Sequence, residues 1–407
     1  MEEVHPLISN EATVFGLLMA LLGGIFWASN HPRFSGFFKV VPALLLCYFL
    51  PSLLTNFNIV PKDTHLYFVA SRYLLPASLV LLTLSIDLKA VFGLGPKALI
   101  MFFTATATII LGGPAAILAV SAFAPDLVGG AGPDAVWRGM STIAGSWIGG
   151  GANQAAMFEI FQPSGALYSA MITVDVVVAE VWMAIILLGA AKSDQVDGWL
   201  KADNRSVKAL QGEMEEFLKK SSRIPTFPEV MMILGIAFGA VAIAHLAGDF
   251  FAPWFSEHMP YTANFSLTSD FFWVVIVATT LGLILSFTSA RNLEGAGASR
   301  WGSVFIYILV GTIGMKMDIK EAIQQPGLIL VGAIWMLFHV FILLGVARWI
   351  KAPFFFVAVG SKANIGGAAS APVAAAAARP AARRGASAGA PSPRARSPRS
   401  RASSRPW

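Results

Sequence analysis

The chain has 407 residues, of which 56% are hydrophobic and only 13% are charged. Soluble globular domains carry about 25% charged residues, so this composition excludes that class and indicates an integral membrane protein. The formal net charge of +6 comes from the C-terminal segment 379–407, which holds eight Arg and no acid; the rest of the chain has 21 basic and 23 acidic residues.

Apolar segments long enough to cross a bilayer as a helix, which takes about 20 residues, recur along the chain. They lie near residues 13–29, 38–56, 67–86, 97–121, 138–160, 167–191, 229–248, 270–289, 301–317, 327–347 and from 353 onward. Because they lack strand-like alternation, we expect an all-α polytopic membrane protein with about eleven transmembrane helices. The single cysteine, Cys47, excludes an intramolecular disulfide and a cysteine-based metal cluster, and no cofactor is expected.

The interval 192–227 is the longest polar stretch before the C-terminal segment. It contains seven Lys and Arg, whereas 249–269 contains none. The positive-inside rule therefore places this linker in the cytoplasm of a multi-pass protein of the cell inner (plasma) membrane. Four of its apolar residues recur at helical spacing and predict an amphipathic surface helix: Val207, Leu210, Met214 and Leu218.

The linker separates two halves, 1–191 and 228–375, that repeat the same order of features. Each half has a span, an Asp-x-Lys motif, another span and a glycine-rich interruption. The motifs are Asp87–Lys89 and Asp318–Lys320, and the interruptions are Gly145–Met157 and Gly360–Gly367. An inverted repeat needs an odd number of crossings between equivalent helices, but six predicted spans separate the two motifs. Either one segment does not cross, an additional one crosses, or the repeat is parallel.

The two interruptions are the strongest indication of a functional site. Irregular backbone survives in a membrane only inside protein or beside a polar cavity, and segments interrupted at matching positions of two repeats form the binding sites of secondary transporters. The alternative is close packing of helices through small residues. We favour a substrate or ion site formed by Ser146, Gly149, Gly150, Gly151, Asn153, Gln154, Ser361, Lys362, Asn364, Gly366 and Gly367.

The segment after the first interruption carries two acids near its middle, Asp175 and Glu180. A charge at that depth is costly, so such an acid faces a cavity, pairs or titrates. Five residues correspond to about 140° around a helix, so the two acids do not share one face. Asp175 is the expected H⁺ or Na⁺ site, with Asn153 as a further Na⁺ ligand, and Glu180 is expected to pair with a structural partner. The alternative is a shifted span that leaves one acid at an interface.

Four further polar residues lie in or beside predicted spans. Lys362 lies inside the second interruption, where it either neutralises an acid or anionic group or caps the broken helix. Arg72 and Glu159 are expected to snorkel or to pair near the membrane interfaces. His339 is expected to be a hydrogen-bonded core residue.

The stretches GSWIGGGANQAAM (145–157) and GSKANIGGAASAP (360–372) resemble those of the YjcL-like family of uncharacterised bacterial membrane proteins, domain-of-unknown-function family 819. The resemblance covers roughly residues 10–375. That family is grouped with the cation–proton antiporters and the bile-acid/sodium symporters. The grouping implies two repeats with broken helices crossing at the centre and acids on the helix after the first break, a position that Asp175 matches. The family has no settled substrate, so the resemblance implies none.

The C-terminal segment 376–407 departs from this pattern. The first interruption is followed by a full span, whereas the second is followed by alanines and then by Arg, Pro, Ser, Ala and Gly. We therefore expect a disordered tail and a missing last helix in the second repeat. A GC-rich gene read in a wrong frame yields the same composition, so we hypothesise a frameshift near residue 375, which resequencing would test. A genuine tail would be a polybasic extension able to contact anionic lipids.

Together these features favour a secondary active transporter that moves a small polar or anionic solute, coupled to Na⁺ or H⁺, by alternating access. The alternatives are a cation–proton antiporter and, because the second repeat is incomplete, a non-transporting membrane protein. The sequence lacks the motifs of metalloproteases, hydrolases and P-loop enzymes, so no enzyme is expected. The expected partners are the small-molecule or ion substrate and the lipid bilayer, not nucleic acid, and a homodimer is an open option.

Overall fold

The computed structural model describes residues 6–38, 41, 43–62, 64–86, 93, 95–202, 224–317 and 326–365. All regular secondary structure within these residues is helical, which confirms the predicted all-α polytopic membrane fold. In the same residues, seven helices are long and apolar enough to cross a membrane, or nine when two bent helix pairs are each counted as a span. The sequence predicted about eleven.

The described residues form the following α-helices. In chain order they are α1 (Glu11–Asn30), α3 (Ala43–Asn56), α4 (His65–Val69), α5 (Leu75–Leu84), α7 (Pro96–Ser121), α9 (Val136–Trp147), α10 (Gly151–Phe161), α11 (Gly165–Ala191), α12 (Ser193–Leu200), α14 (Phe227–His258), α15 (Asp270–Leu285), α16 (Ala298–Lys316), α18 (Gly327–Trp349) and α19 (Phe354–Asn364). A π-helical segment, η2 (Ala70–Leu74), joins α4 to α5. The remaining short turns are η1 (Pro32–Phe34), α2 (Ser35–Phe38), α8 (Pro125–Val128), η3 (Gly132–Asp134), η4 (Pro260–Phe265) and η5 (Ser289–Ala296).

Local sequence signals begin several of these helices. Thr226 and Glu229 form a capping box at the start of α14, which satisfies two N–H groups that the helix itself leaves unpaired. Ser164 accepts a hydrogen bond from the N–H of Leu167 at the start of α11. Pro96 occupies the first position of α7, where its missing N–H costs nothing.

The predicted span 138–160 is wrong, because α9 and α10 form a hairpin. The guanidinium of Arg138 donates to the carbonyl of Phe161, and the rings of Trp137 and Phe161 lie 5.7 Å apart. The first turn of α9 thus contacts the last turn of α10, and both ends of the hairpin lie at the same membrane face. Gly149 and Gly150 at its tip have φ of 132° and 87°, values that L side chains rarely adopt and that reverse the chain here.

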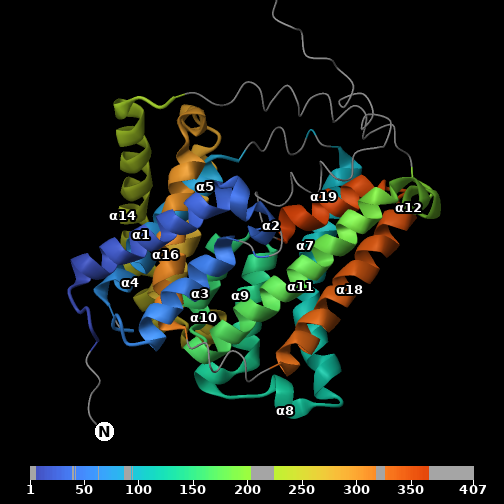
Figure 1. Ribbon diagram of the computed structural model, residues 1–407, viewed down its shortest axis with the longest axis horizontal. Coiled ribbons are helices and arrows are strands. Elements are labelled where there is room, and N and C mark those ends of the chain that lie inside the picture. The colour runs from blue at the N-terminus through green and yellow to red at the C-terminus, as the bar shows by residue number, and fades with distance from the viewer. Residues whose placement is uncertain are drawn as a thin grey trace, which may run out of the picture.

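This hairpin settles the number of crossings between the two halves. The helices α7, α11, α14, α15 and α16 cross in turn between the end of α5 and the end of α16 (Figure 1). We call the membrane face at which α12 and the start of α14 lie the linker face. Because five helices cross between them, α5 ends at the linker face and α16 ends at the opposite face. The backbone of Lys316, at the end of α16, accordingly touches Gly165 at the start of α11. The ends of α5 and α16 therefore lie at opposite faces, as an inverted repeat would require.

The helices pack as two bundles. In Figure 1 the first bundle (α1, α3, α4–α5, α14, α15 and α16) lies on the left, and the second (α7, α11, α12, α18 and α19) on the right. Within the first bundle, helices from the two halves of the chain pack against each other: α16 contacts both α3 and α5, and α15 contacts α5. The hairpin lies between the bundles: α9 contributes Met140 and Ile143 to the core of the second bundle, while α10 contributes Ala155 and Phe158 to the core of the first.

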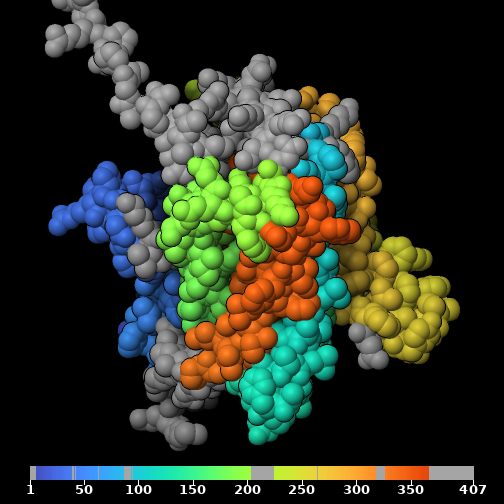
Figure 2. Space-filling view, turned by 90° about the vertical axis from the view of Figure 1, so that its right-hand side faces the viewer, coloured from blue at the N-terminus to red at the C-terminus, as the bar shows by residue number. Residues whose placement is uncertain are grey.

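Apart from Glu180 on α11, the exposed side chains on the outer face of the second bundle are largely apolar, as a lipid-facing surface requires. Figure 2 shows α11, α18 and the α7–α8 segment side by side on this face. The exposed side chains of α11 include Val181 and Leu188, and those of α18 include Leu337 and Phe341. Lipid tails are the solvent that such a surface fits.

Several elements predicted from the sequence lie outside the described residues. These are the two Asp-x-Lys motifs, the amphipathic helix over 207–218, the glycines Gly366 and Gly367, and the C-terminal segment 376–407. Of the segment predicted to begin at 353, the structure describes residues 353–365, which form α19 and Ile365. The helix α19 enters from the linker face.

Candidate functional site

Asp175 lies on α11, where the hairpin meets both bundles, and only 8% of its surface is exposed. Its Oδ1 accepts a 2.7 Å hydrogen bond from the indole Nε1 of Trp147. Its Oδ2 accepts a 3.1 Å hydrogen bond from the amide Nε2 of Gln154. Trp147 ends α9 and Gln154 belongs to the first turn of α10. The carboxylate therefore joins the two arms of the hairpin just below its tip, and Ser146 lies beside it.

A chain of hydrogen bonds extends from Asp175 into the first bundle. The hydroxyl of Tyr48, on α3, donates to Oε1 of Gln154 over 3.2 Å. The hydroxyls of Tyr48 and Tyr168 lie 3.4 Å apart, and Tyr168 stands two turns before Asp175 on α11. The amide of Gln154 thus links the two bundles: its nitrogen donates to Asp175 in the second bundle, and its oxygen accepts from Tyr48 in the first. All three of these side chains are buried.

Lys362 provides a buried cation on the other side of this site. It lies near the end of α19, with 2% of its surface exposed, and within electrostatic range of both Asp175 and Glu180. Glu180 itself is on the exposed side of α11. The two acids therefore face different directions on α11, and Lys362 reaches this site from α19, within the second interruption. An ammonium group buried to this extent requires nearby negative charge.

The tip of the hairpin meets the end of α19 at the centre of the molecule. The N–H of Gly149 donates to the carbonyl of Asn364 over 3.3 Å. The amide of Asn153 closes the tip from within by donating to the carbonyl of Ile148 over 2.7 Å. Because the hairpin enters from the face opposite α19, the two glycine-rich stretches approach each other from opposite sides. Gly151 begins α10 directly after this turn.

Asn364 anchors the end of α19 to α7. Its Nδ2 donates to the carbonyls of Phe102 and Gly360, at 3.2 and 3.0 Å. Its Oδ1 accepts from the hydroxyl of Thr106 at 2.8 Å. With three hydrogen bonds to protein atoms, this amide positions the helix end more than it offers groups to a ligand.

Ser361 belongs to a separate buried network in the second bundle. Its Oγ accepts from Nε1 of Trp182 at 2.8 Å and lies 2.9 Å from Nε2 of His339. Nδ1 of His339 lies 2.7 Å from Oγ1 of Thr108, and that hydroxyl already donates to the carbonyl of Ala105. Nδ1 therefore carries the proton and Nε2 accepts from Ser361. His339 is thus a hydrogen-bonded core residue, as the sequence predicts.

The donors around Asp175 suit a carboxylate better than a Na⁺ site. Both carboxylate oxygens accept from N–H groups, and a cation would have to displace them. Asn153, predicted as a further Na⁺ ligand, donates its amide nitrogen to the carbonyl of Ile148 at the hairpin tip, and no hydrogen bond joins it to Asp175 in the described residues. Within the described residues, no group of three or more His, Cys, Asp or Glu side chains could hold a metal ion. The site contains a buried acidic residue, Asp175 on α11, and a buried basic residue, Lys362 on α19, within electrostatic range of each other.

The structure thus divides the residues predicted for the site. It brings together Ser146, Gln154, Asp175 and Lys362. The side chains of Asn153 and Asn364 instead bond backbone carbonyls near the site, and Ser361 belongs to the network of His339. Glu180 faces outward, and Gly366 and Gly367 lie outside the described residues. Sequence reasoning missed Trp147, Tyr48 and Tyr168. Trp147 could have been found, because it stands inside the glycine-rich stretch, but nothing in the sequence singles out Tyr48.

Comparisons with known proteins agree with a membrane protein of uncharacterised activity. The chain is 26% identical over 286 residues to "Uncharacterized membrane protein YjcL" of Bacillus subtilis (strain 168), an alignment that covers 68% of this chain and 66% of the relative. The chain thus spans just under two thirds of that relative's length. No solved structure matches the chain. Residues 16–383 match the family described as "Protein of unknown function (DUF819)", and the chain therefore belongs to the DUF819 family.

Proposed function

We propose that the protein is a secondary active transporter of the cell inner membrane, which moves a small polar or anionic solute coupled to Na⁺ or H⁺. The observation that carries this proposal is the meeting of the hairpin tip with the end of α19, where Gly149 contacts Asn364 beside Asp175 and Lys362. Broken helices that end at mid-membrane present free N–H and C=O groups, which bind ions and polar solutes.

The position of the hairpin favours alternating access as the mechanism. Its first arm packs on the second bundle, and its second arm packs on the first. Gln154 connects the two bundles by one hydrogen bond to Asp175 and one from Tyr48. A rocking motion of one bundle against the other would exchange these few polar contacts and leave the apolar cores intact. An inverted relation of the two halves would provide two equivalent conformations for such a motion.

Asp175 is the proposed coupling residue. It is a buried acid whose hydrogen-bond partners come from both arms of the hairpin, so a change in its charge acts directly on the geometry of the tip. Lys362, on α19, is the proposed group that neutralises it or an anionic substrate. Either role makes the occupancy of the site dependent on the charge of Asp175.

Transport by the full chain in proteoliposomes with imposed Na⁺ and H⁺ gradients tests this function. A screen of metabolites and cations for thermal stabilisation of the purified protein first selects the solutes. We expect uptake that depends on one of the gradients, and we expect Asp175→Asn to abolish the coupling. The matched control is Asp126→Asn, on an exposed position of α8. Wild-type coupled rates in Asp175→Asn would remove this residue from the mechanism.

The same experiment distinguishes the alternatives. A cation–proton antiporter would move protons against a cation gradient with no organic solute present. A protein that moves neither solute nor ions under any gradient would be a non-transporting membrane protein, and the proposal would fail.

A further inference from the structure

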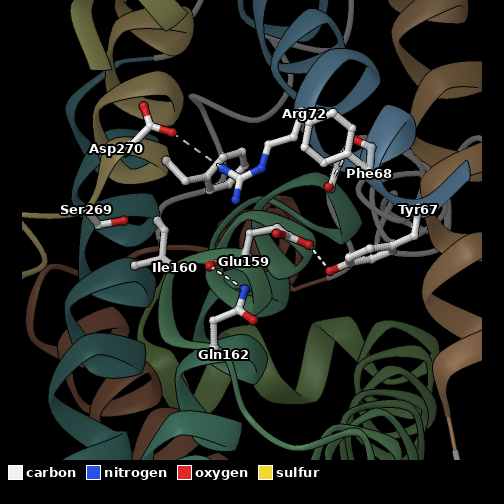
Figure 3. A pocket seen from close by; sticks show the side chains of 10 residues that line it. Tyr67, Phe68, Arg72, Glu159, Ile160, Gln162, Ser269 and Asp270 are labelled. Carbon is white, nitrogen blue, oxygen red and sulfur yellow. Dashed lines mark hydrogen bonds and ion pairs between the residues drawn. The ribbon is translucent and has the colours of Figure 1, made fainter. Parts of the chain in front are cut away.

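A second polar cavity lies away from Asp175, between the base of the hairpin and the first bundle. Its volume is about 370 Å³, and it is lined by three elements: the start of the α4–η2 helix, the end of α10 and the start of α15. Figure 3 shows the side chains of Tyr67, Arg72, Glu159 and Asp270 directed into the same space. The cavity lies at the end of the molecule opposite the linker face, because α10 ends and α15 begins there.

Arg72 is the cation of this cavity, and one nitrogen of its guanidinium has no hydrogen-bond partner in the described residues. Its Nη1 atom is buried and has no hydrogen-bond partner within the described residues. Its ion pair with Oδ2 of Asp270 is long, at 3.8 Å, and the other contact of the guanidinium is with the ring of Phe271, 4.6 Å from its centroid. A buried guanidinium N–H without an acceptor is costly, which is the condition that a bound acceptor relieves.

The two acids near Arg72, Glu159 and Asp270, each have partners besides this guanidinium. The carboxylate of Glu159 accepts from the hydroxyl of Tyr67, and the ammonium of Lys316 lies 3.4 Å from the centre of the Tyr67 ring. The side chain of Asp270 is 48% exposed, so water satisfies much of it. A hydroxyl satisfies Glu159 and water satisfies much of Asp270, whereas the buried Nη1 of Arg72 is a donor without a hydrogen-bond partner in the described part of the chain. A ligand that completes this site must bring acceptor oxygens.

The shape of the donor selects the class of ligand. A guanidinium presents two parallel N–H groups, which match the two oxygens of a carboxylate. The π-helical segment η2 carries Arg72, and such local widenings of a helix are frequently found at functional sites. The cavity volume falls within the range of small-molecule sites, about 300–1,000 Å³.

We propose that this cavity binds a small carboxylate-bearing solute through Arg72. Ser71, Gln162 and Ser269 also line the cavity and supply polar groups for the remainder of such a solute. Glu159 stands five residues after Gln154 on α10, so the same helix carries residues of this cavity and of the Asp175 site. Binding at Arg72 does not require that the chain transports anything, so its failure and that of the transport proposal are separable.

Ligand binding to the purified full chain in detergent tests the assignment. The probes are the sodium salts of acetate, lactate, glutamate and succinate, with sodium chloride and sodium phosphate at matched ionic strength. We expect at least one carboxylate to raise the melting temperature in a saturable way. Arg72→Gln should weaken its apparent affinity at least about tenfold, because a hydrogen bond to a charged group is lost, and Arg72→Lys should have an intermediate effect. Arg348→Gln, at the linker face beside Trp199, is the matched control.

A second measurement on the unmodified protein covers the case in which the Arg72 variants do not fold. Phenylglyoxal labels accessible guanidinium groups, and mass spectrometry locates the label. The stabilising carboxylate should protect Arg72 and leave the labelling of Arg348 unchanged. No stabilisation beyond that of chloride, equal stabilisation by phosphate, equal affinity in Arg72→Gln, or no protection of Arg72 would each overturn the assignment.

Discussion

The indole Nε1 of Trp147 donates a hydrogen bond to Oδ1 of Asp175 over 2.7 Å. This bond attaches the end of α9, immediately before the hairpin tip, to α11. The Trp147 ring lies 4.7 Å from the ring of Trp335 on α18, and Gly112 on α7 leaves the space that the Trp335 ring occupies. A buried contact between two tilted indole rings thus holds the Trp147 side chain in place, and Asp175 accepts from its N–H group.

Replacing Trp147 by Phe should retain most of the stack and remove the donor. A hydrogen bond to a charged group contributes about 1.5–3 kcal/mol, so we expect the free energy of unfolding to fall by about that amount. Denaturant unfolding in detergent micelles measures it. Trp349→Phe, at an 82% exposed position, is the control and should change stability by less than about 0.5 kcal/mol. Equal effects of the two substitutions would mean that the Trp147–Asp175 bond contributes nothing.

Gly150→Ala tests the conformation of the hairpin tip. Gly150 has φ of 87° and ψ of −162°, a region that only glycine adopts without strain. Alanine there should destabilise the protein by about 1–3 kcal/mol. Gly239→Ala, on α14 with open space around its Cα, should be neutral or stabilising by up to about 1 kcal/mol. The difference in melting temperature between these two variants is the measurement, and a stable Gly150→Ala protein would contradict the turn.

Cysteine cross-linking tests the hairpin itself. In a Cys47→Ala background, Trp137→Cys with Phe161→Cys should be joined by a short bifunctional maleimide, because the two rings lie 5.7 Å apart. In one continuous helix, these residues would be about 36 Å apart. Intramolecular cross-linking is read from peptides by mass spectrometry. Trp137→Cys with Ile148→Cys, about 16 Å apart along α9 and its cap residue, is the control that should not react in either arrangement, and no cross-linking of the first pair would disprove the hairpin.

Ser361→Ala tests the network around His339. The substitution leaves Nε1 of Trp182 and Nε2 of His339 buried without their partner. We expect a loss of about 1–3 kcal/mol in the free energy of unfolding. Ser121→Ala is the control, because Ser121 bonds only the carbonyl of Leu118 at an exposed position, and it should change stability by less than about 0.5 kcal/mol. A similar loss in both variants would show that the network contributes no specific stability.

Much of the fold could be predicted because lipid imposes long apolar runs on the helices that cross it. The runs around α7, α11 and α18 were located to within a few residues, whereas α14 (Phe227–His258) extends ten residues beyond the predicted end at 248. The run 138–160 was misread for a physical reason: a hairpin buried between two bundles needs apolar residues on both arms, just as one membrane helix does. The composition alone does not reveal the direction that the chain takes after Gly149 and Gly150.

The sequence by itself determined that the protein is an all-α membrane protein, and it located two glycine-rich stretches and an acid in the span after the first. Hydropathy and glycine content carry that information because they act locally along the chain. Only the tertiary structure decided that the first glycine-rich stretch turns back, that the ends of α5 and α16 lie at opposite faces, and that Trp147, Gln154 and Lys362 surround Asp175. Those features depend on which helices pack together over long sequence separations, since each arm of the hairpin is stabilised by a different bundle.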